Sequence, residues 1–145
     1  MTQLAETLAV ATSIPALFLC GLVLIHWFPE ARRAFWDRHD AAGWLVLGVS
    51  VSFAGMLLST LYWSLFWTMT RLGQPAAAWF SDNGALFNLF TRQTAVIAAA
   101  WCHLKAYHSH ARSKSKDPTF HLKWTLALAA LLALALSLIG SFHHG

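Results

Sequence analysis

The sequence predicts an all-α protein, an integral membrane bundle of four transmembrane helices with both termini on the outer side. Four apolar stretches fill most of its 145 residues, and 57% of the residues are hydrophobic. Only 11% are charged, whereas a soluble domain carries about 25%. Lysine and arginine gather in two of the three connecting segments. Because a soluble fold of this size cannot bury so much apolar surface, we expect lipid to cover part of it.

The first span is predicted at residues 8–28. Its roughly 20 residues match a hydrocarbon core about 30 Å thick. Pro15 is expected to bend it and Pro29 to follow its last turn, since proline is common just beyond a helix end. The N-terminus lacks a basic run, so we expect the segment to be retained and not cleaved as a signal peptide. Residues 30–42 are expected to be a connector.

The second span is predicted at residues 43–70, long enough to tilt or to project from the membrane. Gly48 and Ser52 are four residues apart, and so are Gly55 and Ser59. Small residues let helix backbones approach closely. Hydroxyls can bond across helices or back to their own carbonyls. We therefore expect a central packing helix. A polar pore lining is the alternative, with the row formed by Thr60, Ser64 and Thr68.

The second half of the chain is expected to hold two further spans. Residues 71–84 contain glycine, proline, aspartate and asparagine, which predict a loop. The third span is predicted at residues 85–107 and the fourth at 124–142. The fourth is nearly all leucine and alanine, a composition typical of a lipid-facing helix. A basic loop at 108–123 joins them, and residues 1–145 form a single transmembrane domain.

Orientation follows from the basic residues. Eight of the ten lie in or beside the first and third connectors: Arg32, Arg33, Arg38, Lys105, Arg112, Lys114, Lys116 and Lys123. Short cytoplasmic loops are enriched in lysine and arginine, so N-out and C-out is expected. We expect a multi-pass protein of a bacterial or phage-host inner membrane, whose basic loops touch anionic headgroups. Nucleic acid is not expected as a partner, because the charges lie between apolar spans.

Arg92 lies about two turns inside the third predicted span. An arginine at that depth costs several kcal/mol unless it is paired, hydrated or snorkelling. Asn88 and Gln93 are its local hydrogen-bonding groups, and Glu6 and Asp82 are the acids expected on its side. One interpretation is an anchor that reaches the outer interface. The other is an anion, quinone or pore site on an intramembrane polar face.

His26 and His103 both fall near the inner ends of their spans. Two histidines at matched depth on neighbouring helices can ligate a b-type haem axially, so a haem site at these residues is an alternative. No cofactor is otherwise expected. A metal site is not expected either, because His103 and His108 are five residues apart and carboxylates are scarce. Cys20 and Cys102 are expected to be free, buried thiols.

No motif for catalysis stands in the sequence. It has no Gly-x-Ser-x-Gly, no glycine-rich phosphate loop and no Cys-x-x-Cys. We therefore expect no enzyme, and the first hypothesis is a structural or accessory subunit bound to other membrane subunits or to itself. The second is a holin-like pore-forming protein. The third is a haem- or quinone-binding anchor that uses His26, His103 and Arg92.

Overall fold

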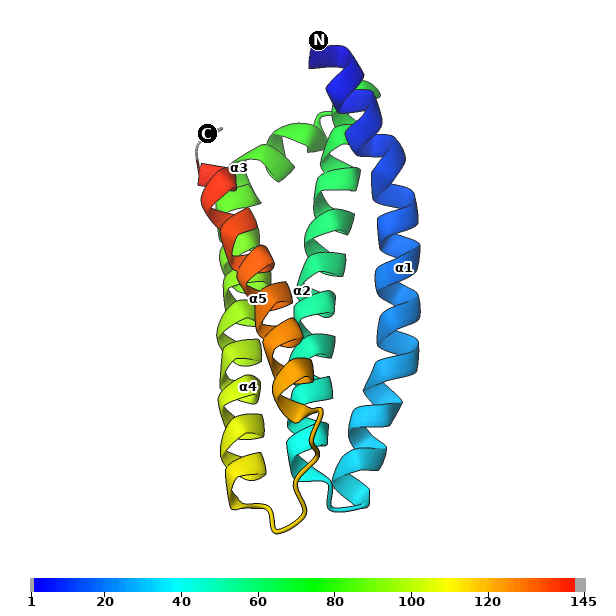
Figure 1. The fold of residues 1–145 in the computed structure, drawn as a ribbon. Coiled ribbons are helices and arrows are strands. Elements are labelled where there is room, and N and C mark those ends of the chain that lie inside the picture. The colour runs from blue at the N-terminus through cyan, green and yellow to red at the C-terminus, as the bar shows by residue number, and fades with distance from the viewer. Residues whose placement is uncertain (1, 143–145) are drawn as a thin grey trace.

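The computed structural model describes residues 2–142, with the side chains of residue 11 and of residues 14–136. No strand occurs in that range, so the all-α prediction is confirmed. The elements are α1 (Thr2–Trp36), α2 (Asp40–Arg71), α3 (Ala76–Asn88), the π-helix η1 (Leu89–Gln93), α4 (Thr94–Arg112) and α5 (Phe120–Phe142). α1 begins and α5 ends at the same end of the bundle (Figure 1), the end that the sequence predicts to be the outer one. The turns that follow α1 and α4 lie at the opposite, inner end.

α1 continues past Pro29, so the predicted helix end at residue 28 was wrong. The two turns after Pro29 are held by their contacts. Ala31 is only 2% exposed, and the ring of Phe35 meets Trp44 of α2 edge-on, with 5.2 Å between centroids. An interior proline costs about 3 kcal/mol, which this packing offsets. The expected connector at 30–42 shrinks to residues 37–39, and Arg38 there takes a φ of 59°.

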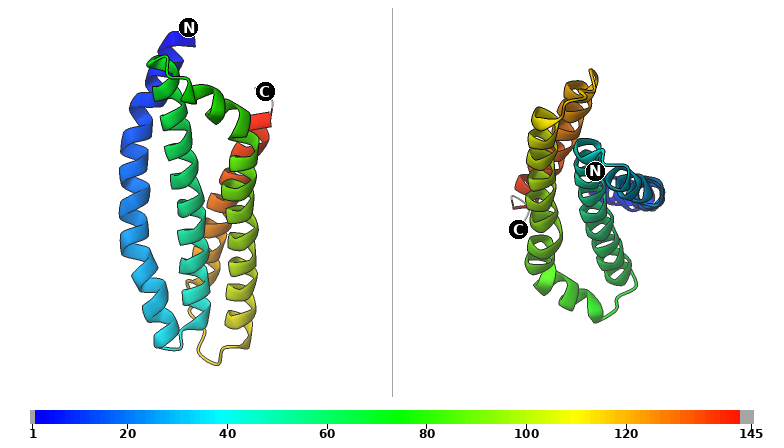
Figure 2. Two further views of the ribbon diagram at one scale, coloured as in Figure 1. Left: turned by 180° about the vertical axis from the view of Figure 1, so that it is seen from behind. Right: turned by 90° about the horizontal axis from the view of Figure 1, so that it is seen from below.

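α2 is the central helix. It packs against α1 on one side and against α4 and α5 on the other, whereas α1 contacts no described helix except α2. A view along the bundle shows this arrangement, with α1 standing to one side (Figure 2). The fold is therefore a three-helix group, α2, α4 and α5, with α1 added at its edge.

Residues 71–84 do not form the predicted loop. The chain turns within residues 72–75, where Gly73 has a φ of 62°, and α3 then crosses the outer end from α2 to α4 (Figure 1). Tyr62 of α2 holds α3 in place. Its hydroxyl donates to the carbonyl of Phe80, and its ring stacks on that of Phe87 with 4.1 Å between the centroids. This aromatic packing prevails over the helix-breaking residues in the segment.

The inner loop is also shorter than predicted. α4 extends to Arg112 and α5 begins at Phe120, so residues 113–119 remain of the expected loop at 108–123. Asp117 accepts hydrogen bonds from the backbone N–H and the hydroxyl of Thr119 and from Lys123 Nζ, at 2.8, 2.7 and 2.9 Å. The bond from Lys123, and then those from Thr119, hold the pKa of Asp117 well below its usual range. This carboxylate therefore fixes the start of α5.

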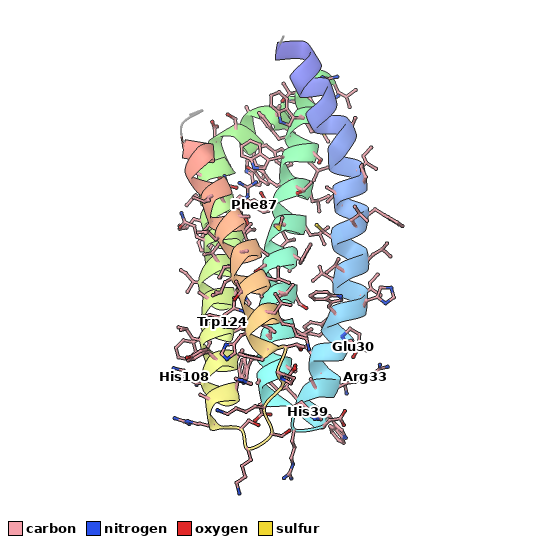
Figure 3. All side chains as sticks on the ribbon, in the orientation of Figure 1. Glu30, Arg33, His39, Phe87, His108 and Trp124 are labelled. Carbon is pink, nitrogen blue, oxygen red and sulfur yellow. The ribbon has the colours of Figure 1, made fainter. Side chains whose placement is uncertain are left out.

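Two helices have the length and hydropathy of membrane spans. They are Ile14–Trp36 within α1, and the whole of α2, Asp40–Arg71. Phe120–Leu136 is a shorter apolar segment among the described residues. By length and composition, these two helices could cross a membrane. Charged side chains such as Glu30 and Arg33 lie toward the inner end (Figure 3).

Candidate functional site

α2 and α4 approach closely at two glycines of α2. The small-residue row of α2, Gly48, Ser52, Gly55 and Ser59, is fully buried. A Cβ atom built on Gly55 would overlap the Cβ of Ala95. One built on Gly48 would lie 2.8 Å from two ring atoms of His103. The two helices therefore meet at a distance that only glycine allows at these two positions.

Arg92 lies within η1, against this row. Its Nε donates to the hydroxyl of Ser59 at 2.5 Å, and the side chain is half-buried. A π-helix adds one residue to a turn, and such turns are frequent at functional sites. Asn88, one turn earlier, buries its Oδ1 with no hydrogen-bond partner among the described residues. Gln93, the residue after Arg92, is also half-buried.

The structure describes the side chain of only one of the two acids expected near Arg92. Asp82 is exposed on α3, and the side chain of Glu6 lies outside the described part. Ser59 was not foreseen as the arginine's partner. The sequence places Ser59 in the packing row, but the spacing does not say which helix that row meets.

His103 is 1% exposed and packs over Gly48. Neither ring nitrogen makes a hydrogen bond of normal geometry, although the backbone of Ala127 on α5 lies nearby. The carbonyl of His103 accepts a 3.1 Å bond from the indole of Trp124. His26 is exposed on α1. Because α1 and α4 do not touch and α2 stands between them, the two histidines do not face one another as axial ligands of one haem would.

The remaining polar candidates are dispersed. The hydroxyls of Thr60, Ser64 and Thr68 each donate to a carbonyl four residues earlier, at 2.7–2.8 Å. Cys20 and Cys102 are free and buried, on α1 and α4. Within the described part of the chain, no three histidine, cysteine or acidic side chains come together as metal ligands would.

An apolar groove lies between α1 and α5, with α2 as its floor. It encloses about 440 Å³, and one residue of α1 lines it together with residues of α2 and α5: Trp27, Leu45, Val46, Val49, Phe53, Lys123, Leu126, Ala127 and Ala130. Lys123 is its only charged residue. Hydrophobic periodicity could not reveal this groove, because its walls are about a hundred residues apart in the sequence.

The chain matches no protein-family model, and comparison with curated proteins and with solved structures finds no significant similarity.

Proposed function

We propose that the protein is a four-pass membrane protein that acts as a non-catalytic accessory subunit of a larger membrane assembly. In this arrangement α1, α2, the η1–α4 segment and α5 cross the membrane. The segregation of lysine and arginine to the inner end supports N-out and C-out. The partner is a second membrane subunit whose helix places large apolar side chains in the groove between α1 and α5.

The observation that carries this proposal is the one-sided attachment of α1. A helix in a closed four-helix bundle has two neighbours, whereas α1 touches only α2 among the described helices. Its outward side chains include Ile14, Phe18 and Ile25, which are 67–69% exposed. The groove beside α1 is apolar and open, so it offers a partner helix the contact area that α5 does not supply.

The polar groups between α2 and α4 support a non-catalytic role. The glycine contacts leave no space between these helices for a substrate. Arg92 is engaged by Ser59, and the hydroxyl row of α2 is engaged by its own backbone. These groups therefore serve helix packing, which an accessory subunit requires.

The test is purification in a mild detergent, followed by native mass spectrometry and an absorbance spectrum. A second polypeptide at fixed stoichiometry supports the proposal. Ala130→Phe, which fills the groove, should reduce recovery of that polypeptide at least about tenfold, since overpacking a contact costs about 1–3 kcal/mol. Ala129→Phe is the matched control, because Ala129 is also exposed on α5 but does not line the groove.

Other results would redirect the assignment. A homo-oligomer without a second polypeptide, combined with loss of membrane potential on expression, favours the holin-like pore former. A Soret band lost in His103→Ala favours the haem-binding anchor. Equal recovery of the partner with Ala130→Phe and with Ala129→Phe excludes the groove as the docking surface.

A further inference from the structure

A large polar cavity lies at the inner end of the bundle. It measures about 780 Å³ and lies between the α1–α2 turn, the last turn of α4 and the α4–α5 loop. Three cations line it, Arg38, Arg112 and Lys116, together with the acids Asp40 and Asp117.

The charges of this cavity do not cancel. Lys123, which lies outside the cavity, already pairs with Asp117 at 2.9 Å. Asp40 is then the one lining acid without an ion pair among the described residues, and it opposes three cations. The cavity therefore carries surplus positive charge, which favours an anionic occupant.

The first turn of α2 opens into the same cavity. Asp40, Ala41 and Ala42 all line it. The first backbone hydrogen bond of the helix runs from the N–H of Gly43 to the carbonyl of His39, at 2.9 Å. The N–H groups of the three preceding residues therefore have no carbonyl partner within the helix. His39 is the N-cap residue and makes no side-chain capping bond. Uncapped N–H groups at a helix start carry partial positive charge and bind oxyanions.

His110 points independently to a ligand. It lines the cavity and is only 7% exposed. Its ring stacks on that of Phe120, with 4.0 Å between the ring centroids and 8° between the ring planes. The ring of His121 stands nearly perpendicular to it, with 5.5 Å between centroids. Its backbone carbonyl accepts from the N–H of Ser113 at 3.2 Å, but its ring nitrogens make no hydrogen bond to a described residue. Because these ring nitrogens are not sealed from solvent and the residue lines the cavity, they are available to an occupant of the cavity.

We propose that this cavity binds a phosphate group, held by Arg38, Arg112, Lys116, the first N–H groups of α2 and His110. Guanidinium groups suit the site because they donate two parallel hydrogen bonds to a phosphate. The phosphate comes from the headgroup of an anionic lipid or from a soluble ion, and both present the same oxygens. The site does not depend on the partner subunit proposed above, and either proposal can fail without the other.

The experiment uses the full chain in an alkyl maltoside detergent, which contains no phosphate. Inorganic phosphate, short-chain phosphatidylglycerol and short-chain diacylglycerol are titrated separately by calorimetry. The test variant is Arg38→Gln with Arg112→Gln. The matched control is Arg32→Gln with Arg33→Gln, which removes the same charge at the same end from residues that do not line the cavity.

The test variant should weaken binding of a phosphate-bearing probe at least about tenfold, and the control less than about twofold. Binding of phosphatidylglycerol but not of diacylglycerol assigns the site to a headgroup, and binding of inorganic phosphate alone assigns it to a soluble ion. His110→Phe keeps the stack on Phe120 but removes the ring nitrogens, and should weaken binding about threefold.

Three results overturn the proposal. The first is no binding of either phosphate-bearing probe to the unaltered protein. The second is an equal loss in the two double variants, which would mean attraction by net charge alone. The third is equal binding of diacylglycerol and phosphatidylglycerol, which would mean that acyl chains and not phosphate are recognised. Helicity and monodispersity of each variant establish that the fold is intact.

Discussion

Gly55 of α2 lies directly against Ala95 of α4, so closely that a Cβ atom on the glycine would overlap the alanine methyl group. The backbone oxygen of Thr91 lies 3.5 Å from the same point. Neither neighbour is the end of a flexible side chain, so neither can rotate away. The separation of α2 and α4 is therefore set by the absence of one side chain.

Gly55→Ala should destabilise the protein by up to about 2 kcal/mol, because overpacking costs about 1–3 kcal/mol and the gain in helix propensity offsets about 1 kcal/mol of it. Gly21→Ala is the control. A Cβ at Gly21 of α1 meets nothing within 4 Å, so this change should be neutral or slightly stabilising. Unfolding by a denaturing detergent in mixed micelles measures both. Adding Ala95→Gly should recover most of the loss, and a loss that persists would mean that the two residues are not the cause.

Arg92 and Ser59 should be energetically coupled. Ser59→Ala removes the acceptor of Nε, and Arg92→Lys removes the Nε donor, so each should cost about 1–2 kcal/mol. The double variant should cost about 1 kcal/mol less than the sum of the two. Arg71→Lys at the exposed end of α2 should change stability by less than about 0.5 kcal/mol. Strictly additive losses would contradict the coupling.

His103→Leu should leave stability unchanged or raise it. The imidazole buries two nitrogens without hydrogen bonds of normal geometry, and an apolar side chain removes that penalty of about 1–3 kcal/mol. His26→Leu, on the exposed face of α1, should have little effect. The measurement is the same unfolding titration. Severe loss of folding in His103→Leu alone would instead indicate a ligand that the buried ring holds.

The start of α5 should lose protection at low pH. Because the folded-state pKa of Asp117 is lowered, its stabilising effect is present above the usual aspartate pKa of about 3.9. That effect is lost as the pH falls below this value toward the lowered pKa. The protection factors of residues 119–124 in hydrogen exchange, corrected for the slower intrinsic exchange in acid, should therefore fall at low pH. Asp117→Asn should show faster exchange already at neutral pH and a weaker pH dependence, and identical profiles would refute the cap.

Arg38→Gly should stabilise the inner turn by about 1 kcal/mol, because glycine adopts a φ of 59° without the Cβ penalty. The same change should weaken phosphate binding, since it removes one of the cations that line the cavity. Thermal unfolding and calorimetry measure the two effects. Arg33→Gly, inside α1, should instead cost about 1 kcal/mol. A gain in stability with unchanged phosphate affinity would show that Arg38 does not contact the anion.

The all-α class could be predicted because each apolar run is long and continuous. The helix ends could not, because they depend on partners. Pro29 predicts an end, yet the contact of Phe35 with Trp44 carries α1 onward. Asp82 and Gly84 predict a loop. The segment is nevertheless a helix, because Tyr62, which lies in the preceding helix, holds it by a hydrogen bond and by ring stacking.

The candidate site could also be predicted only in part. The spacing of Gly48, Ser52, Gly55 and Ser59 was visible in the sequence, whereas the helix against which they pack was not. The bond from Arg92 to Ser59 and the stacking of His110 on Phe120 each join residues from different helices. Such pairs follow from the order of helices around α2, which no local pattern encodes.

The attachment of α1 to α2 alone has a consequence for biosynthesis. Every contact that α1 makes with a described helix lies within the first 71 residues, so this hairpin is complete before the ribosome has made α4. The chain should therefore tolerate a break in the turn at 72–75. Two fragments expressed from separate messages should then fold separately and rejoin along the contact between α2 and α4.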